Sequence, residues 1–119
     1  MLDDGLSYQL LRLLSSRPAI SQRAIATSLG LSLGKINYAL RALIEKGFIK
    51  AEEFCNSKNK QAYSYILTPK GLEEKANVTI RYFKKKMREY EDLQKELAEL
   101  KREVDKLSET GIKSQEDKE

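Results

Sequence analysis

Hydrophobic positions at the start of the chain repeat with the period of an α-helix. One helical face carries four leucines, Leu6, Leu10, Leu13 and Leu14. Asp3 or Asp4 is suited to cap this helix, because a short acidic side chain accepts hydrogen bonds from the free N–H groups of a first turn. The segment SSRP at 15–18 is expected to end it, since the residue before a proline disfavours helical geometry.

Two further helices are predicted, and both have the same start signal. Ser21 and Ser32 are expected N-caps, each with an apolar residue just before it and an isoleucine four positions inside, the spacing of a hydrophobic staple. The first of these helices is expected to end before Gly30 and the second before Gly47. Only GLS at 30–32 joins them, and so short a glycine-containing link predicts a helix-turn-helix.

The pattern changes after Gly47 from helical to extended. The segments FIKAEEF at 48–54 and AYSYIL at 62–67 are β-branched, aromatic and roughly alternating, as strands are. Between them lies the polar, turn-rich segment CNSKNKQ with Lys58 and Lys60, which predicts a hairpin with a basic tip. Three helices followed by such a hairpin predict a winged helix-turn-helix.

The C-terminal third is predicted to be one long helix. Thr68 is its expected cap and Pro69 its first residue, and no proline or glycine interrupts residues 72–110. A stripe with alternating spacings of three and four follows, and it indicates a coiled coil. The predicted dimerisation residues are Phe83, Tyr90, Leu93, Leu97, Leu100, Val104 and Leu107. The stripe extends back to Leu72 but passes through Lys86, so we expect the coiled coil proper to begin after that lysine.

These elements predict a mainly α fold with a small β-hairpin (α+β), a winged helix-turn-helix followed by a long C-terminal dimerisation helix. We place the winged domain at residues 1–68, the coiled-coil helix at 69–107 and a flexible tail at 108–119.

Composition narrows the chemistry. The chain has no histidine and one cysteine, Cys55, which excludes a zinc site of the usual ligands and histidine-based acid–base catalysis. The carboxylates show no catalytic spacing, so we predict no catalytic residue, no metal site, no cofactor and no enzyme activity. A long apolar run and a signal peptide are both missing from the sequence, so we expect a cytoplasmic protein with no membrane partner.

The net charge of +4 is unevenly placed. Residues 1–69 hold nine Lys or Arg against five Asp or Glu, whereas residues 70–119 hold thirteen of each. Within residues 5–51 there are seven basic residues and one acid, Glu45. An excess of positive charge in the helix-turn-helix half favours a polyanionic partner.

The third helix has a core face and a second face of unusual composition. At 100° per residue the expected core face is Leu33, Ile36, Leu40, Leu43 and Ile44. Gly34, Lys35, Tyr38 and Ala42 point the other way, flanked by Asn37 and Arg41. Small, amide and cationic groups near a helix N-terminus suit entry into the major groove of double-stranded DNA, with Lys35 or Arg41 bonding guanine or phosphate and Asn37 bonding adenine.

The segments ISQRAIATSLGLSLGKINYALRALIEKGFIKAEEF at 20–54 and NSKNKQAYSYILTPKG at 56–71 resemble MarR-type winged-helix regulators. The strings SLGKINYALRALIEKGFIK, NSKNK and YILTPKG resemble more closely the exopolysaccharide-associated MarR family proteins, over about residues 6–107. The resemblance implies a bacterial, nucleoid-associated homodimer on pseudo-palindromic DNA, controlling polysaccharide genes. It places the third helix in the major groove and the wing beside it. The predicted DNA-binding residues are Ser21, Gln22, Arg23, Ser32, Gly34, Lys35, Asn37, Tyr38, Arg41, Asn56, Ser57, Lys58, Asn59 and Lys60.

The sequence departs from that family at both ends. It starts almost at the first core helix and ends in a single long helix, so we expect neither the family's effector pocket nor a small-molecule inducer. Cys55 is interpreted as a small strand residue rather than a redox sensor, because no second cysteine is present to resolve it. Two other functions stay open: a protein-interaction module, and a non-specific nucleic-acid-binding protein that uses the basic cluster RYFKKKMR at 81–88.

Overall fold

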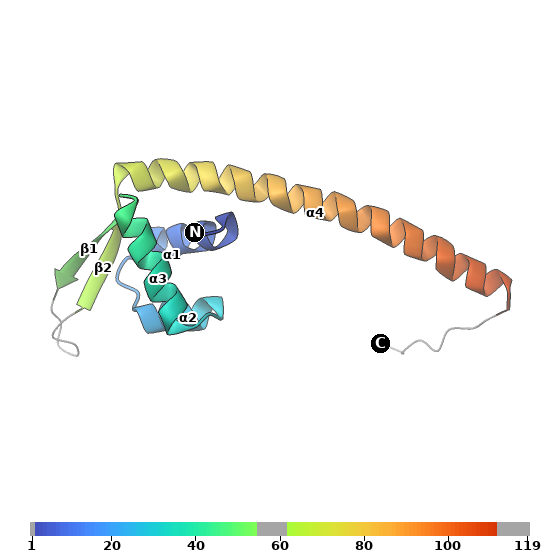
Figure 1. Cartoon of the computed structure of the whole chain (residues 1–119), viewed down its shortest axis with the longest axis horizontal. Helices are drawn as coiled ribbons and strands as arrows, with labels where there is room; N and C mark the ends of the chain where they lie inside the picture. Colours follow the sequence, from blue (N-terminus) through green and yellow to red (C-terminus); the bar gives the residue numbers. More distant parts are fainter. Residues whose placement is uncertain (1, 55–61, 112–119) are drawn as a thin grey trace. The chain divides into compact units, whose positions relative to one another are not determined.

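The structure of the chain is a computed structural model that describes residues 2–54 and 62–111. Three helices come first, α1 (Asp4–Ser16), α2 (Gln22–Leu29) and α3 (Leu33–Glu45). Two strands follow, β1 (Ile49–Phe54) and β2 (Ala62–Leu67), and the chain continues into the long helix α4 (Pro69–Glu109) (Figure 1). The mainly α fold with one hairpin is the fold that the sequence predicts.

The helix starts are capped by the side chains that the sequence indicates. Asp3, rather than Asp4, accepts a hydrogen bond from the Leu6 N–H at 2.7 Å. The hydroxyl oxygens of Ser21 and Ser32 accept from N–H groups three residues further on, at 3.0 and 3.1 Å. Gly30 and Gly47 have φ angles of 69° and 79°, and this left-handed geometry lets the chain leave α2 and α3 sharply.

The hairpin is antiparallel, with Ile49 opposite Leu67 and Ala51 opposite Tyr65. Its second strand also contacts the segment that joins α1 to α2, because the Tyr65 N–H donates to the Pro18 carbonyl at 2.9 Å. This backbone bond fixes strand β2 on the segment that precedes α2, the first helix of the helix-turn-helix.

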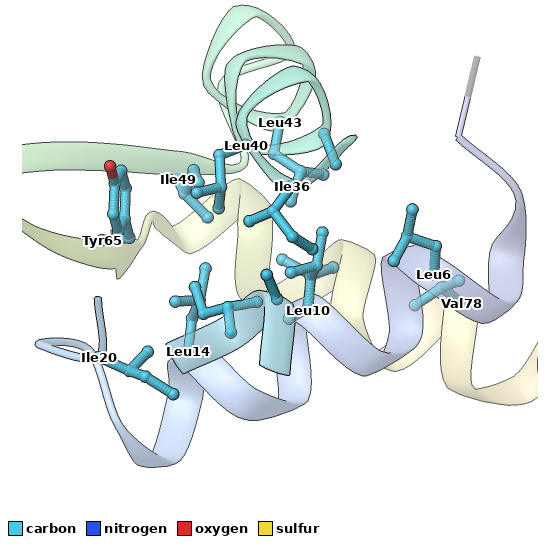
Figure 2. Packing of buried hydrophobic residues seen from close by; sticks show 14 residues of the cluster. Leu6, Leu10, Leu14, Ile20, Ile36, Leu40, Leu43, Ile49, Tyr65 and Val78 are labelled. Atoms are coloured by element: carbon cyan, nitrogen blue, oxygen red, sulfur yellow. The ribbon is translucent and has the colours of Figure 1, made fainter. Parts of the chain in front are cut away.

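The core is a single apolar cluster contributed by all the elements (Figure 2). Helix α3 supplies four of its residues, Ile36, Ala39, Leu40 and Leu43. The predicted core face was wrong at its edges, since Leu33 and Ile44 are 41% and 38% exposed. Leu33 is the first residue of α3, too near the helix end to reach the cluster, and Ile44 lies at the margin of the buried stripe. On α1, Leu11 is buried while Leu13 is only partly so.

The start of α4 packs along α1. Val78 is fully buried in the core, and the rings of Tyr82 and Tyr8 stack with centroids 5.0 Å apart. Arg81 donates to Asp4 at the start of α1 at 3.1 Å and to Glu74 at 3.0 Å. These hydrogen bonds, first to Asp4 and then to Glu74, raise the pKa of Arg81 above its ordinary value. The shift moves the titration of Arg81 further above neutral pH, so Arg81 itself adds no pH dependence to stability near neutrality.

The chain divides into two units, residues 1–82 and 83–119. The first unit includes the start of α4, and the second contains the rest of that helix. Within residues 2–54 and 62–111, no helix combines the length and the apolar character needed to cross a membrane.

Candidate nucleic-acid interface

The exposed face of α3, which we call the recognition face, carries the residues that the sequence places there. Gly34, Lys35, Tyr38 and Arg41 are exposed, and Asn37 is half-buried at the margin. Among the described residues, neither Lys35 nor Arg41 has an acidic partner within ion-pair distance. Their charged groups are therefore available to an anionic ligand such as the phosphate backbone or to the acceptor edge of guanine.

The first turn of α3 is open to close approach. Within the described part of the chain, a Cβ added at Gly34 would meet no heavy atom within 4 Å. The Ser32 hydroxyl is occupied in capping and accepts from the Lys35 N–H. The turn thus combines the partial positive charge of a helix N-terminus with a residue that has no side chain, which suits contact with phosphate.

Two of the predicted DNA-binding residues contact each other, and one of them also contacts the hairpin. The Asn37 amide nitrogen lies 3.3 Å from the Gln22 amide oxygen. The Gln22 amide nitrogen in turn donates to the Tyr65 hydroxyl at 2.9 Å. A chain of hydrogen bonds therefore runs from α3 through the first residue of α2 to strand β2.

The neighbours of Gln22 differ from it in exposure. Ser21 and Arg23 are exposed, whereas Gln22 is half-buried. The Ser21 hydroxyl accepts the Ala24 N–H, which confirms the predicted cap, whereas a contact of Ser21 with DNA stays a prediction. Arg23 is placed as an exposed cation at the start of α2.

The predicted wing tip, Asn56 to Lys60, and Cys55 lie outside the described residues. At the base of the wing, Lys50 pairs with Glu52 along β1 at 3.2 Å. On β2 the rings of Tyr63 and Tyr65 stack with centroids 6.4 Å apart.

The predicted dimerisation residues lie on α4 with exposed side chains. Phe83, Tyr90, Leu93, Leu97, Leu100, Val104 and Leu107 are each between 47% and 62% exposed. Lys86, which interrupts the predicted stripe, pairs with Glu89 at 3.2 Å. The neighbouring Met87 is 41% exposed. This exposed apolar stripe is larger than a monomeric helix in water would normally present.

Sequence reasoning missed Tyr65. Its position in an alternating strand predicts that one side of the residue faces the core, and the side chain is 6% exposed. The pattern carries no signal for the partner of its hydroxyl, because that partner lies 43 residues away on another element. The structure also weakens the interpretation of the basic cluster at 81–88 as a nucleic-acid contact, since Arg81 and Lys86 form ion pairs with acids of the same chain.

Comparison with known proteins gives this geometry a context. Residues 3–50 match the family model described as winged helix-turn-helix DNA-binding. No curated protein matches the chain in sequence.

Solved structures of regulators share the fold. The S. aureus MepR–DNA complex has a TM-score of 0.60 and 18% identity, and the match covers 90% of this chain and 76% of that one. A MarR family protein of Mycobacterium tuberculosis in complex with salicylic acid has a TM-score of 0.58 and 22% identity, covering 85% and 74%. The structure of MarR has a TM-score of 0.54 and 26% identity, covering 87% and 71%. Residues 3–50 are therefore similar to a winged helix-turn-helix DNA-binding family, and the chain as a whole has the winged-helix fold of these MarR-family structures.

Proposed function

We propose that the protein is a sequence-specific transcriptional regulator that binds double-stranded DNA as a homodimer. The observation that carries this proposal is the recognition face of α3, where Lys35, Tyr38 and Arg41 stand exposed on a helix whose opposite face is fixed in the core. In a helix-turn-helix the second helix enters the major groove, and its exposed side chains contact base edges. The similar structure of MepR in complex with DNA supports the same use of this fold.

The wing is proposed to contact DNA beside the recognition helix. Lys58 and Lys60 supply positive charge at its tip. Contacts to phosphate or to the minor groove fix the position of a protein on DNA but carry little sequence information. We therefore assign affinity to the wing, and base preference to the recognition face.

The stripe on α4 is proposed to form a parallel dimer. With Tyr90, Leu97 and Val104 at position a and Leu93, Leu100 and Leu107 at position d, Glu96 falls at g and Lys101 at e. In a parallel pair Glu96 would meet Lys101 of the partner subunit, whereas an antiparallel pair would bring g positions, and so Glu96 or Glu103, near other acids. Lys101 also lies 3.5 Å from Asp105 of its own helix. An exposed pair of that kind contributes only about 0.3–0.5 kcal/mol, so it does not prevent Lys101 from pairing with Glu96 of the partner subunit instead.

A parallel dimer has consequences for the target. Two winged domains at one end would engage half-sites about one helical turn apart, or a multiple of it, on a pseudo-palindrome. The resemblance to exopolysaccharide-associated regulators supports polysaccharide biosynthesis genes as targets and the bacterial cytoplasm, at the nucleoid, as the location.

The test is a selection of bound fragments from the genome of the source bacterium, followed by titration of the selected duplex and a scrambled duplex of the same composition. We expect specific binding at low salt, with log affinity falling by about 0.9 per phosphate neutralised for each unit of log salt. Equal affinity for the selected and scrambled duplexes would contradict the proposal. A protein-interaction module would show that equality together with no salt dependence.

A further inference from the structure

A chain of polar contacts lies at the margin of the apolar core. It joins three elements: Tyr65 on β2, Gln22 at the start of α2 and Asn37 on α3. Figure 2 shows the Tyr65 hydroxyl at the edge of the apolar cluster, pointing away from it. The Tyr65 ring is 6% exposed and its backbone N–H is bonded to Pro18, so the hydroxyl is held at a fixed point.

The hydrogen-bond capacity of each group defines what remains available. Gln22 uses an N–H to reach Tyr65 and its carbonyl oxygen to accept from Asn37. Asn37 uses one of its two N–H groups on Gln22, which leaves one N–H and its carbonyl oxygen. One donor and one acceptor on the same amide are the pair that contacts N7 and the N6 amino group of adenine in the major groove.

The position of Asn37 on α3 agrees with this division between bonded and available groups of its amide. Asn37 borders the recognition face and is half-buried, so the Gln22 contact faces inward while the rest of the amide faces the margin of the exposed surface. An unanchored asparagine rotates freely about its terminal torsion and presents donor and acceptor in either order. A fixed partner removes that freedom and so raises the discrimination between adenine and other bases.

We propose that Gln22 is a positioning residue that orients the Asn37 amide for adenine, with Tyr65 as its anchor. This inference rests on the proposed function, because it requires α3 to contact base edges. It differs from a direct role for Gln22 in DNA binding, since the Gln22 amide uses one N–H and its oxygen for contacts within the domain.

The experiment measures binding of the full chain to the selected operator and to every single base-pair variant of it. Asn37→Ala should abolish the preference for adenine at one position of each half-site. Gln22→Met, which keeps the length of the side chain, should reduce discrimination at that same position by about tenfold, the size of one bidentate contact. Tyr65→Phe, which keeps the buried ring, should reduce it at the same position by a smaller factor.

Two comparisons separate positioning from general structure. The double variant Gln22→Met with Asn37→Ala should lose no more discrimination than Asn37→Ala alone, because the two residues act as one unit. Tyr63→Phe is the matched control: it removes a hydroxyl from the same strand that takes no part in this chain of bonds, and it should leave the base preference unchanged. Thermal unfolding of each variant verifies folding, and Tyr65→Phe keeps the test decisive if Gln22→Met does not fold.

The outcomes are distinct. Specific binding by the wild type, with Gln22→Met and Tyr65→Phe weakening all sequences equally, would overturn the positioning role while leaving the proposed function intact. The same conclusion would follow if the double variant Gln22→Met with Asn37→Ala lost more base discrimination than Asn37→Ala alone. A base other than adenine at the affected position would overturn the assignment of Asn37. A wild type without any preferred duplex would overturn both proposals.

Discussion

The backbone of α4 passes directly over the carbonyl group of Phe48 at Gly71. A Cβ added to Gly71 would lie 2.8 Å from the Phe48 carbonyl carbon and closer still to its oxygen. The same oxygen accepts the Thr68 N–H at 3.0 Å, and the Thr68 hydroxyl donates to Gly47 and accepts from the Gly71 N–H. The segment LTPKG at 67–71 is therefore a joint that fixes the start of α4 on the end of α3.

Replacement of Gly71 by alanine should damage this joint. The collision is with backbone rather than with a flexible side chain, so no rotamer change relieves it. We expect Gly71→Ala to lower the free energy of unfolding by about 3 kcal/mol, the upper end of the range for overpacking. Chemical denaturation followed by circular dichroism measures it. An unchanged midpoint would show that the close approach does not exist in solution.

Local signals account for what the sequence predicts. The caps Ser21, Ser32 and Thr68 act on N–H groups three residues away, so spacing along the chain is enough to identify them. The requirement for glycine at position 71 and the bond from Tyr65 to Gln22 depend on residues brought together from distant parts of the chain. A one-dimensional pattern identifies the face of an element, but it contains no information on which polar groups meet there.

Replacement of Gly34 by alanine is expected to stabilise the fold, whereas the same change at Gly71 is expected to destabilise it. Space is open around Gly34 within the described residues, and alanine is favoured over glycine in a helix by about 0.5–1 kcal/mol. Gly34→Ala should therefore raise the unfolding midpoint and, because its methyl group stands between the helix backbone and DNA, lower operator affinity. A variant that is more stable and binds normally would show that this turn does not approach the DNA.

Wing and recognition face should respond differently to loss of charge. Lys58→Ala and Lys60→Ala are expected to weaken all duplexes about equally and to reduce the magnitude of the salt slope by about one unit each. Replacement of a true base-contacting residue among Lys35, Tyr38 and Arg41 should cost about 1–3 kcal/mol and relax preference at one base position. Affinity measured across operator variants at two salt concentrations distinguishes the two effects. Unaltered site preference in all three recognition-face variants would exclude α3 as the recognition helix.

The dimer stripe can be tested with one residue and its neighbour. Leu97→Glu places a carboxylate at position a, where the same residue of the partner would face it, and should weaken dimerisation by about 3 kcal/mol or more. Ala98→Glu introduces the same group at position b on the outer side of the helix, and its dimer should be unaffected. Light scattering over a range of concentrations reports both, and operator affinity should fall with the first variant only. A dimeric Leu97→Glu protein would exclude this stripe as the interface.

The residues before Tyr90 that belong to the dimer interface can also be determined by experiment. An uninterrupted heptad through Tyr90 and Leu93 assigns Lys86 to position d and Met87 to position e. Lys86, however, is paired with Glu89, whereas Met87 is an exposed apolar side chain that gains free energy from burial. We therefore expect the partner helix to cover Phe83, Met87 and Tyr90, which requires a local shift in the heptad at Tyr90.

Matched glutamine variants decide between the two registers. With Met87 in the interface, Met87→Gln should raise the dimer dissociation constant by about tenfold, or ~1.4 kcal/mol, because a methionine side chain loses its burial. Lys86→Gln should then leave dimerisation unchanged, since Lys86 would remain in water beside Glu89. With Lys86 at position d, removal of its charge from the seam would instead tighten the dimer, and Met87→Gln would have little effect. Sedimentation equilibrium of the two variants and the wild type distinguishes these results.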